Sequence, residues 1–260
     1  MSMKLTVVTP SFNQGPYIEQ TIKSILNQKG DFELEYLIMD GGSTDGTIEI
    51  LKKYNGQINW ISERDRGQSH AVNKGFSKAS GDIIGWLNSD DLYEEGAIQK
   101  VASAFQKDSH CQWVVGKCRI IDENSNEIRK PVTQYKNKWL TKYDYDRLLK
   151  EDFISQPAVW FRKSFLNEVG LLDENLHYTM DYDLWLRMGA KAEPVIINDY
   201  LASFRFYSGS KTGGELKKSL SEVRELCRRY ANGKKGILLG NWLYRMKIRV
   251  GYGLMSGIGR

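Results

Sequence analysis

Hydrophobic residues in the first hundred positions follow two alternating patterns, one of short continuous runs and one of helical spacing. Short runs rich in β-branched and aliphatic residues indicate strands, and apolar residues three or four positions apart indicate helices. The predicted strands are Lys4–Pro10, Leu34–Asp40, Ile58–Ser62 and Asp82–Leu87, and the helices are Tyr17–Gln28, a segment from Thr44, Ser69–Ser80 and Gly96–Gln106. Four strand–helix units in succession predict a parallel sheet with helices on both faces.

The second half of the chain has a mixed pattern. The predicted strands are Trp113–Ile121, Glu127–Thr133, Ala158–Arg162, Val195–Asn198 and Leu201–Phe206, and the helices are Ser164–Val169, Met180–Gly189 and a C-terminal helix through Leu216 and Tyr230. Residues 134–152 are charged and rich in tyrosine, which favours a flexible loop with a short helix. Tyr244–Val250 alternates strictly, so it fits a strand as well as a helix.

Charge is unevenly distributed along the chain. Residues 226–260 contain eight Lys/Arg and no Asp/Glu, so the formal charge of +5 comes entirely from this tail. A basic tail indicates attraction to an anionic surface such as the inner membrane leaflet, or to nucleic acid. With Trp242, Tyr244 and Tyr252 it could lie at the inner membrane face as a peripheral contact. A solvated tail or one that packs in an oligomer is the alternative. The remaining residues are net acidic, so the body is not predicted to bind nucleic acid.

Cysteine usage and the N-terminus indicate a cytoplasmic setting. The three cysteines are widely spaced and form no CxxC motif, which favours reduced thiols. The N-terminal residues run directly into a strand without the apolar region of a signal peptide. No apolar run approaches the roughly 18 residues of a membrane span.

Each of the four predicted parallel strands ends in a polar cluster. These clusters are Thr9–Asn13, Asp40–Ser43, Glu63–Arg66 and Asn88–Asp91. Ligands of open α/β sheets bind at the carboxyl ends of the strands, so the clusters predict one binding site. The glycine-rich segment Asp40–Thr47 permits close approach of a ligand to the backbone, although an ordinary capped turn is the alternative.

Asp90 and Asp91 directly follow a predicted buried strand. Two adjacent carboxylates repel each other unless a cation lies between them, and hard divalent cations bind carboxylate and phosphate oxygen. The pair therefore predicts Mg²⁺ or Mn²⁺ chemistry on a phosphorylated ligand. A solvated turn with a helix cap is the local alternative.

These segments, in this order and spacing, resemble the inverting family 2 glycosyltransferases, and most closely bacterial enzymes that build O-antigen, capsule or other surface polysaccharides. The resemblance covers about residues 4–207 and rests on Thr9–Asn13, Asp40–Thr47, Asp65–Gln68 with Asn73–Gly75, Asn88–Asp91 and Met180–Arg187. It implies a GT-A fold, with a mostly parallel central sheet flanked by helices and a C-terminal helical extension. The predicted catalytic domain is residues 1–212, with a nucleotide-binding half to about 106 and an acceptor half from about 107, followed by a helix and basic aromatic tail at 213–260.

The resemblance also implies roles for individual residues. The nucleotide, expected to be a UDP-sugar, is assigned to Thr9, Pro10, Ser11, Asn13, Asp40, Gly41, Ser43, Arg66, Gln68, Asn73, Asn88, Ser89 and Asp90. Asp91 is expected to bind the metal, with Asp90 shared between ribose and metal. Gly41 stands where many members have a second Asp, and Met180 stands where they have a Glu. The loop from Tyr207 lacks the late His that often completes the metal site, so the third metal ligand stays open.

Asp181 is the predicted catalytic base. An inverting transfer needs a base that deprotonates the acceptor hydroxyl as it attacks the anomeric carbon, and a partly desolvated carboxylate suits this role. An N-cap is the alternative for Asp181. Asp183 could contact the acceptor or pair with Arg187, Gln156 could line the acceptor pocket or form a turn, and Lys211 could meet the diphosphate.

Other assignments remain open from the residues alone. Arg64 and Arg66 fit either the diphosphate or salt bridges to Glu63 and Asp65, and His177 fits a metal ligand or a structural residue. The predicted reaction moves a sugar from a nucleotide diphosphate to a hydroxyl of a glycan or lipid-linked glycan. A sugar-phosphate nucleotidyltransferase and a non-catalytic scaffold that binds nucleotide sugars are the alternatives.

Overall fold

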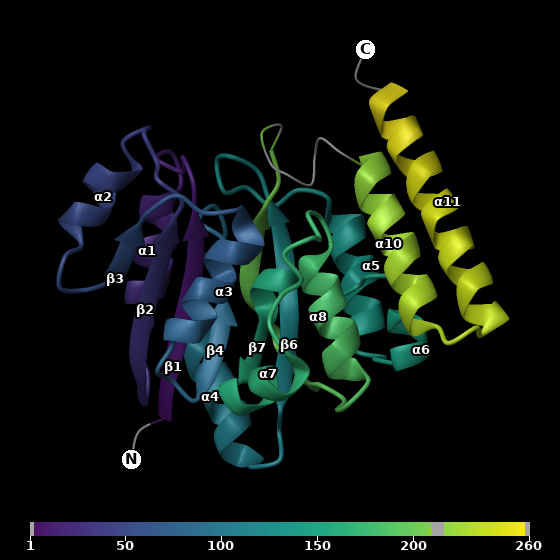
Figure 1. Cartoon of the computed structure of the whole chain (residues 1–260), viewed down its shortest axis with the longest axis horizontal. Coiled ribbons are helices and arrows are strands. Elements are labelled where there is room, and N and C mark those ends of the chain that lie inside the picture. The colour runs from purple at the N-terminus through teal and green to yellow at the C-terminus, as the bar shows by residue number, and fades with distance from the viewer. Residues whose placement is uncertain (1–2, 208, 210–215, 258–260) are drawn as a thin grey trace.

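The computed structural model describes residues 3–207, 209 and 216–257 of the chain. One sheet of eight strands runs through the described residues in the order β3-β2-β1-β4-β7-β6-β8-β5. The strands are β1 Met3–Ser11, β2 Phe32–Asp40, β3 Asn59–Ser62, β4 Ile83–Trp86, β5 Leu92–Tyr93, β6 Trp113–Ile121, β7 Val159–Arg162 and β8 Val195–Arg205. Figure 1 shows this sheet in the middle of the molecule with helices packed along it.

The predicted parallel half of the sheet is confirmed. β1 pairs in parallel with both β2 and β4, and β2 pairs in parallel with β3. Side chains that alternate along β1 enter two cores: Val7 packs in the cluster of Ile18 from α1, and Val8 in the cluster of Phe76 from α3. The four helices of this half are α1 Ile18–Leu26, α2 Thr47–Lys53, α3 Gln68–Lys78 and α4 Ala97–Lys107. Helices therefore cover both faces, and the carboxyl ends of β1 to β4 meet at one edge.

The second half of the sheet is mixed in direction. β7 pairs antiparallel with β4 and β6, β8 runs parallel to β6, and the short β5 pairs antiparallel with β8. The two strands predicted at 195–206 are one strand, because a register shift beside Lys117 carries the pairing through the break in the pattern. The helical elements here are α5 Lys130–Leu140, α6 Tyr145–Leu148, η1 Gln156–Ala158, α7 Lys163–Val169 and α8 Met180–Gly189.

Two predictions for this half are wrong. Residues 127–133 are not a strand: Glu127 makes one isolated bridge to Ile121, and α5 begins three residues later. Pro131 explains the change, since it lacks an N–H for a sheet but fits the first turn of a helix. The segment 134–152, predicted as a loop with a short helix, consists largely of α5 and α6.

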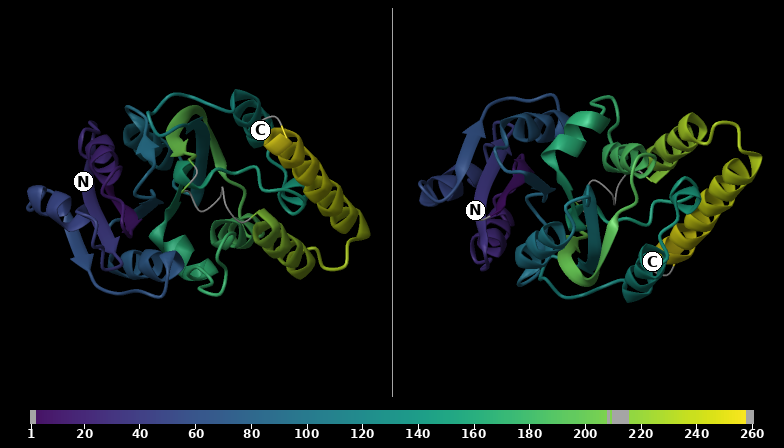
Figure 2. Two further views of the ribbon diagram at one scale, coloured as in Figure 1. Left: turned by 90° about the horizontal axis from the view of Figure 1, so that it is seen from above. Right: turned by 90° about the horizontal axis from the view of Figure 1, so that it is seen from below.

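Two C-terminal helices, α10 Leu216–Tyr230 and α11 Lys235–Gly257, complete the described structure. The turn between them contains Asn232 and Gly233, both with positive φ, and the two helices lie side by side at one end of the molecule (Figure 2). The alternating segment 244–250 is therefore helical. None of the helices in the described ranges is long and apolar enough to span a membrane.

Candidate active site

The turns after β1 and β2 are locked together by side chains. Asn13, which has a φ of +52°, donates its backbone N–H to Ser43 Oγ and accepts at Oδ1 from Thr44 N–H. Gly15 N–H donates to Asp45 Oδ2 at 2.9 Å. The predicted nucleotide-binding residues Asn13 and Ser43 thus lie side by side at this edge of the sheet.

Asp40 ends β2 with its carboxylate almost wholly buried. Oδ2 accepts hydrogen bonds from the backbone N–H groups of Gly42 and Ser43 and from Ser62 Oγ, and Oδ1 accepts from Ser43 Oγ. The carboxylate therefore organises the glycine-rich turn and fixes it to β3. These four hydrogen bonds satisfy the carboxylate oxygens, so the carboxylate can be buried.

Gly41 leaves space that a side chain from the next loop fills. Asp65 Oδ2 lies 2.6 Å from the position that a Cβ would take at Gly41, and Phe12 Cδ2 lies 3.3 Å from it. Phe12 is 59% exposed at the end of β1, which is unusual for so large an apolar ring. From the sequence, Phe12 had no assigned role and Asp65 only that of a salt-bridge partner, although an exposed aromatic residue in a polar strand end was the available signal.

Thr9 and Ser11 lie beneath these turns. Thr9 is buried and its Oγ1 accepts from the hydroxyl of Tyr36 at 3.2 Å. The backbone carbonyl of Ser11 accepts from Gly41 N–H, whereas its buried Oγ has no hydrogen-bond partner among the described residues. Pro10 lies between them in the same strand. Ser11 Oγ is thus a polar atom that a ligand can satisfy.

Asn88 is the centre of a hydrogen-bond network at the end of β4. Its Oδ1 accepts from Gln68 Nε2 at 2.8 Å and from Trp86 Nε1 at 2.9 Å, and its Nδ2 donates to Gln156 Oε1 at 3.0 Å. Gln156 also donates to the carbonyl of Trp86. The structure therefore brings together Gln68, Asn88 and Gln156, which come from three separate segments of the sequence.

The two adjacent carboxylates have different surroundings. Asp91 is 0% exposed; its Oδ1 accepts from Arg205 N–H at 2.8 Å and its Oδ2 from Asn88 Nδ2 at 3.2 Å. Burial, and next the charge of Asp90, raise the pKa of Asp91 well above its ordinary value. Asp91 thus holds β8 against the β4 loop. Ser89, also buried, accepts at its carbonyl from Thr21 Oγ1.

Asp90 is the more accessible of the pair. Its side chain is partly exposed, and its carboxylate accepts a hydrogen bond from the hydroxyl of Tyr207. The Tyr207 ring packs on Tyr17, with 5.0 Å between the ring centroids. Burial raises the pKa of Asp90, while this hydrogen bond and the charge of Arg205 oppose the rise.

Arg205, which the sequence analysis did not single out, holds this loop in place. It is fully buried, with Nε donating to the carbonyl of Asp90 and the terminal nitrogens donating to the carbonyl of Asp122 and to Gln20 Oε1. A buried guanidinium is tolerated only where its donors are satisfied. Its position at the end of β8 could not be read from the local sequence.

Two residues predicted to contact the nucleotide, Asn73 and Arg66, make contacts within the protein. Asn73 is buried, and its amide both donates to the carbonyl of Leu172 and accepts from Leu172 N–H, each at 3.0 Å. Arg66 forms a salt bridge with Glu174 at 2.7 Å, so its partner is neither Glu63 nor Asp65. The two side chains fix the segment before α8 to α3 and to the loop that leads into it, because their partners, Leu172 and Glu174, lie in that segment.

Asp181 lies in the first turn of α8, and Thr179 rather than Asp181 is the N-cap residue. Its side chain is partly exposed, and Oδ1 accepts from Tyr182 N–H. The carboxylate of Glu222 in α10 accepts from the backbone N–H groups of His177, Tyr178 and Thr179 and from Thr179 Oγ1. The helix that carries Asp181 is therefore anchored at its start by a C-terminal helix.

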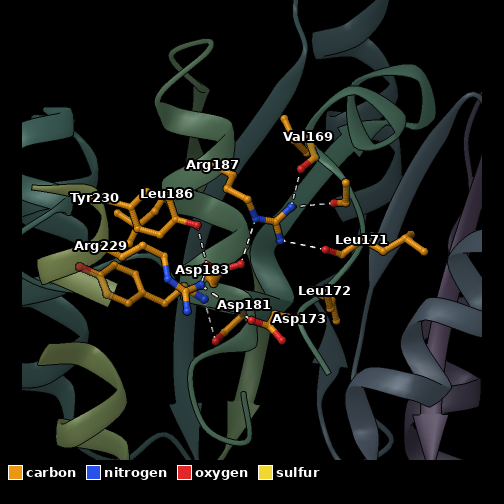
Figure 3. A network of polar contacts seen from close by, with 12 residues as sticks. Val169, Leu171, Leu172, Asp173, Asp181, Asp183, Leu186, Arg187, Arg229 and Tyr230 are labelled. Carbon is orange, nitrogen blue, oxygen red and sulfur yellow. Dashed lines mark hydrogen bonds and ion pairs between the residues drawn. The ribbon is translucent and has the colours of Figure 1, made fainter. Parts of the chain in front are cut away.

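Asp183 is buried and held by protein donors. It is 2% exposed, and Figure 3 shows Arg187 and Tyr230 directed at it, with Arg187 Nε 2.9 Å from Oδ2 and the Tyr230 hydroxyl 2.8 Å from Oδ1. Arg187 also donates to the carbonyls that follow α7. Pairing with Arg187, the alternative from the sequence, is thus what the structure shows. Lys211 lies outside the described residues.

Asp152 is a further carboxylate near Asp181. It lies between α6 and η1, is partly exposed, and its Oδ1 is buried without a hydrogen-bond partner among the described residues. Burial raises the pKa of Asp152 to about 7; the charge of Lys136 opposes this rise and that of Asp181 adds to it. The two carboxylates are therefore close enough for their charges to interact.

The metal-binding capacity of the site rests on few protein groups. No group of three His, Cys, Asp or Glu side chains within the described part of the chain could hold a metal ion. One accessible carboxylate, Asp90, fits a cation that takes its other ligands from water and from substrate phosphate, as Mg²⁺ commonly does.

This combination of fold and site defines a class. A mixed, mostly parallel sheet with polar turns at the ends of β1 to β4 is the arrangement of the GT-A fold. The chain belongs to glycosyltransferase family 2, since the sequence model of Glycosyl transferase family 2 matches residues 6–170.

Relatives and solved structures agree with this assignment. The putative teichuronic acid biosynthesis glycosyltransferase TuaG of Bacillus subtilis is 27% identical over 232 residues, covering 86% of this chain and 88% of TuaG. The structure of S. aureus TarS 1-349 in complex with UDP-GlcNAc has a TM-score of 0.70 and 21% identity, covering 94% of this chain and 72% of the other. The mannosyltransferase PcManGT from Pyrobaculum calidifontis, in complex with GDP-Man and Mn²⁺, has a TM-score of 0.71 and 16% identity, covering 100% and 76%.

Some relatives are considerably longer. The chain spans 64% of the length of an uncharacterised Nostoc glycosyltransferase, to which it is 26% identical over 207 residues. These likenesses confirm the predicted family and GT-A fold.

Proposed function

We propose that this chain transfers a sugar, with inversion, from a UDP-sugar to a hydroxyl of a glycan or lipid-linked glycan during synthesis of a cell-surface polymer. The main support is that the four polar strand ends and the segment leading into α8 are connected through α3. Gln68 and Asn73 of α3 link the two: Gln68 contacts Asn88 after β4, and Asn73 contacts the segment before α8. These contacts support our assignment of Asp90 and Asp181 to one site.

The donor nucleotide would bind over the turns after β1, β2 and β3. The exposed ring of Phe12 offers a surface on which a base can stack, and Asp65 beside Gly41 offers an acceptor for the edge of the base. The unpartnered Ser11 Oγ and the backbone of Gly41 and Gly42 lie next to this space. TarS, whose structure holds UDP-GlcNAc, supports a UDP-sugar for this fold.

Asp90 is the residue we assign to the divalent metal, Mn²⁺ or Mg²⁺. Its carboxylate is partly exposed at the strand ends, whereas that of Asp91 is enclosed by protein donors. When bound, such an ion neutralises negative charge on the diphosphate leaving group. Tyr207, the hydrogen-bond partner of Asp90, would orient this carboxylate toward the donor.

Asp181 is the proposed base. The acceptor oxygen forms a bond to the anomeric carbon, the bond from that carbon to the diphosphate oxygen breaks, and the hydroxyl proton passes to the Asp181 carboxylate. The electron pair of the broken bond leaves with the nucleoside diphosphate. Partial burial favours this role because a base in a partly desolvated site accepts a proton near neutral pH.

A donor screen with matched variants tests the proposal. Purified chain is incubated with Mn²⁺ and a panel of UDP-, GDP- and dTDP-sugars, and thermal stabilisation and donor hydrolysis are measured. We expect stabilisation by a UDP-sugar, and a loss of transfer of about 100-fold or more in D181N. D90N should lose metal-dependent turnover, while D199N, on the outer part of β8, should behave as the unaltered chain.

The outcomes separate the alternatives. Full activity of D90N or D181N would refute the site assignment. Release of pyrophosphate from a nucleoside triphosphate and a sugar phosphate would indicate a nucleotidyltransferase. Stabilisation by a nucleotide sugar without any turnover would indicate a scaffold.

A further inference from the structure

The outer face of α11 is an exposed apolar stripe. Leu239, Trp242, Leu243, Met246 and Val250 are each between 40% and 59% exposed. Their spacing of three or four residues places them on one face of the helix. Isolated exposed apolar residues are ordinary, but five on one helical face form a continuous surface without a partner in the described structure.

The opposite face of α11 is the one that packs on the protein. Ile237 and Asn241 are buried, and Asn241 Nδ2 donates to the carbonyl of Lys150 at 3.0 Å. Lys247, at the border between the two faces, lies 3.9 Å from the centroid of the Tyr135 ring in α5. The helix is therefore already anchored through its inner side, so the stripe is not needed to attach α11 to the fold. Figure 1 shows α11 at the outer end of the molecule, beside α10.

Basic side chains border the stripe. Residues 226–260 contain eight Lys/Arg and no Asp/Glu, and Lys235, Lys247 and Arg249 are exposed on α11. Arg245 has a lowered pKa because of burial and because of the positive charges of Arg224, Arg249 and Arg228. Mutual repulsion of this kind marks a local excess of positive charge that an anionic surface would relieve.

We propose that the outer face of α11 lies on a phospholipid surface that contains anionic headgroups. The apolar stripe would enter the boundary between headgroups and acyl chains, and the flanking cations would contact phosphate. A helix with three cations between residues 245 and 249 would lie along the membrane plane rather than across it. A nucleic acid would satisfy the cations but leave the apolar stripe exposed to water.

Charge also decides against a second copy of the chain as the occupant. Two copies that met through this stripe would bring two segments rich in Lys/Arg and free of Asp/Glu together, and like charges at an interface are costly. An anionic bilayer complements both the positive charge and the apolar stripe of this face. The inference goes beyond the proposed transfer reaction, since it concerns where the enzyme works and does not depend on the donor.

The test is co-sedimentation of the full chain with phosphatidylcholine vesicles, with and without phosphatidylglycerol. We expect binding to the anionic vesicles that weakens as salt is raised. The double variant W242Q/L243Q should bind about tenfold or more weakly. L171Q, which alters an equally exposed leucine after α7, should bind as the unaltered chain does.

A second variant tests the charges without touching the stripe. R228Q/R249Q should reduce binding to anionic vesicles and flatten its salt dependence, with the melting temperature and turnover of a water-soluble acceptor unchanged. Undiminished vesicle binding by W242Q/L243Q would overturn the proposal. So would a dimer that dissociates in that variant while the unaltered chain ignores vesicles, or selective binding of DNA over vesicles.

Discussion

Asp152 provides a quantitative test of the electrostatics around the proposed base. Burial is the main reason that its pKa is raised to about 7, from an ordinary value of 3.8, and Oδ1 has no partner among the described residues. Replacing Asp152 by Asn keeps nearly the same volume and removes the charge. The change therefore isolates the cost of an ionised carboxylate at this position.

The raised pKa of Asp152 determines how the stability of the fold changes with pH. Since the folded protein holds the proton more tightly than the unfolded chain, ionisation destabilises the fold increasingly from about pH 4 to about pH 7. A difference of about 3 pKa units corresponds to about 4 kcal/mol at most. Partial exposure reduces this value, so D152N should gain about 1–3 kcal/mol at pH 8. The gain should be smaller at pH 5, where the folded-state carboxyl is protonated.

Urea denaturation at pH 5, 7 and 8 measures this gain, with the midpoint and slope fitted separately. D146N is the matched control, because Asp146 is exposed and pairs with Lys234 at 3.2 Å, so its stability difference should be small at each pH. An unchanged midpoint for D152N at pH 8, or a gain that is the same at every pH, would show that the carboxylate is not held as the structure indicates.

Two further substitutions test how the site is supported. E222A removes the acceptor for three backbone N–H groups before α8, so we expect a loss of about 1–2 kcal/mol in urea denaturation and a lower kcat with an unchanged KM for the donor; equal kcat would separate Glu222 from the placement of Asp181. G85A places a Cβ 2.7 Å from the ring of the fully buried Trp160, which should cost about 1–3 kcal/mol. An unchanged melting temperature of G85A would contradict the packing of β4 against β7.

Local sequence was sufficient for the parallel half of the fold. The apolar runs that form β1 to β4 are short and bounded by polar turns, and each is followed by a segment with helical spacing. The spacing of apolar residues and the order of the segments therefore both predicted a parallel sheet. The strand predicted at 127–133 was wrong because the alternating pattern was given more weight than Pro131, which indicates the start of a helix. The two residues of β5 carry no period at all, and only their pairing with β8 defines them.

The roles of individual site residues were harder to predict because long-range partners decide them. Asp90 and Asp91 are adjacent and chemically identical, yet Arg205, more than a hundred residues later, accounts for the buried position of Asp91. Asn73 is similarly engaged by Leu172, and Asp183 by Tyr230. A local pattern can place a carboxylate at the end of a strand, but it cannot tell which oxygen remains free for a ligand.

The contacts of α10 argue for a different division of the chain from the one predicted at residue 212. Glu222 holds the segment that leads into α8, and Tyr230 and Arg229 reach Asp183 one turn further on (Figure 3). Because Asp181 lies between these anchors, the position of the proposed base depends on a helix that follows the predicted catalytic domain. We therefore infer that α10 belongs to the catalytic body. The functional boundary would fall at the turn around Gly233, leaving α11 as the separate element whose outer face is free to meet a membrane.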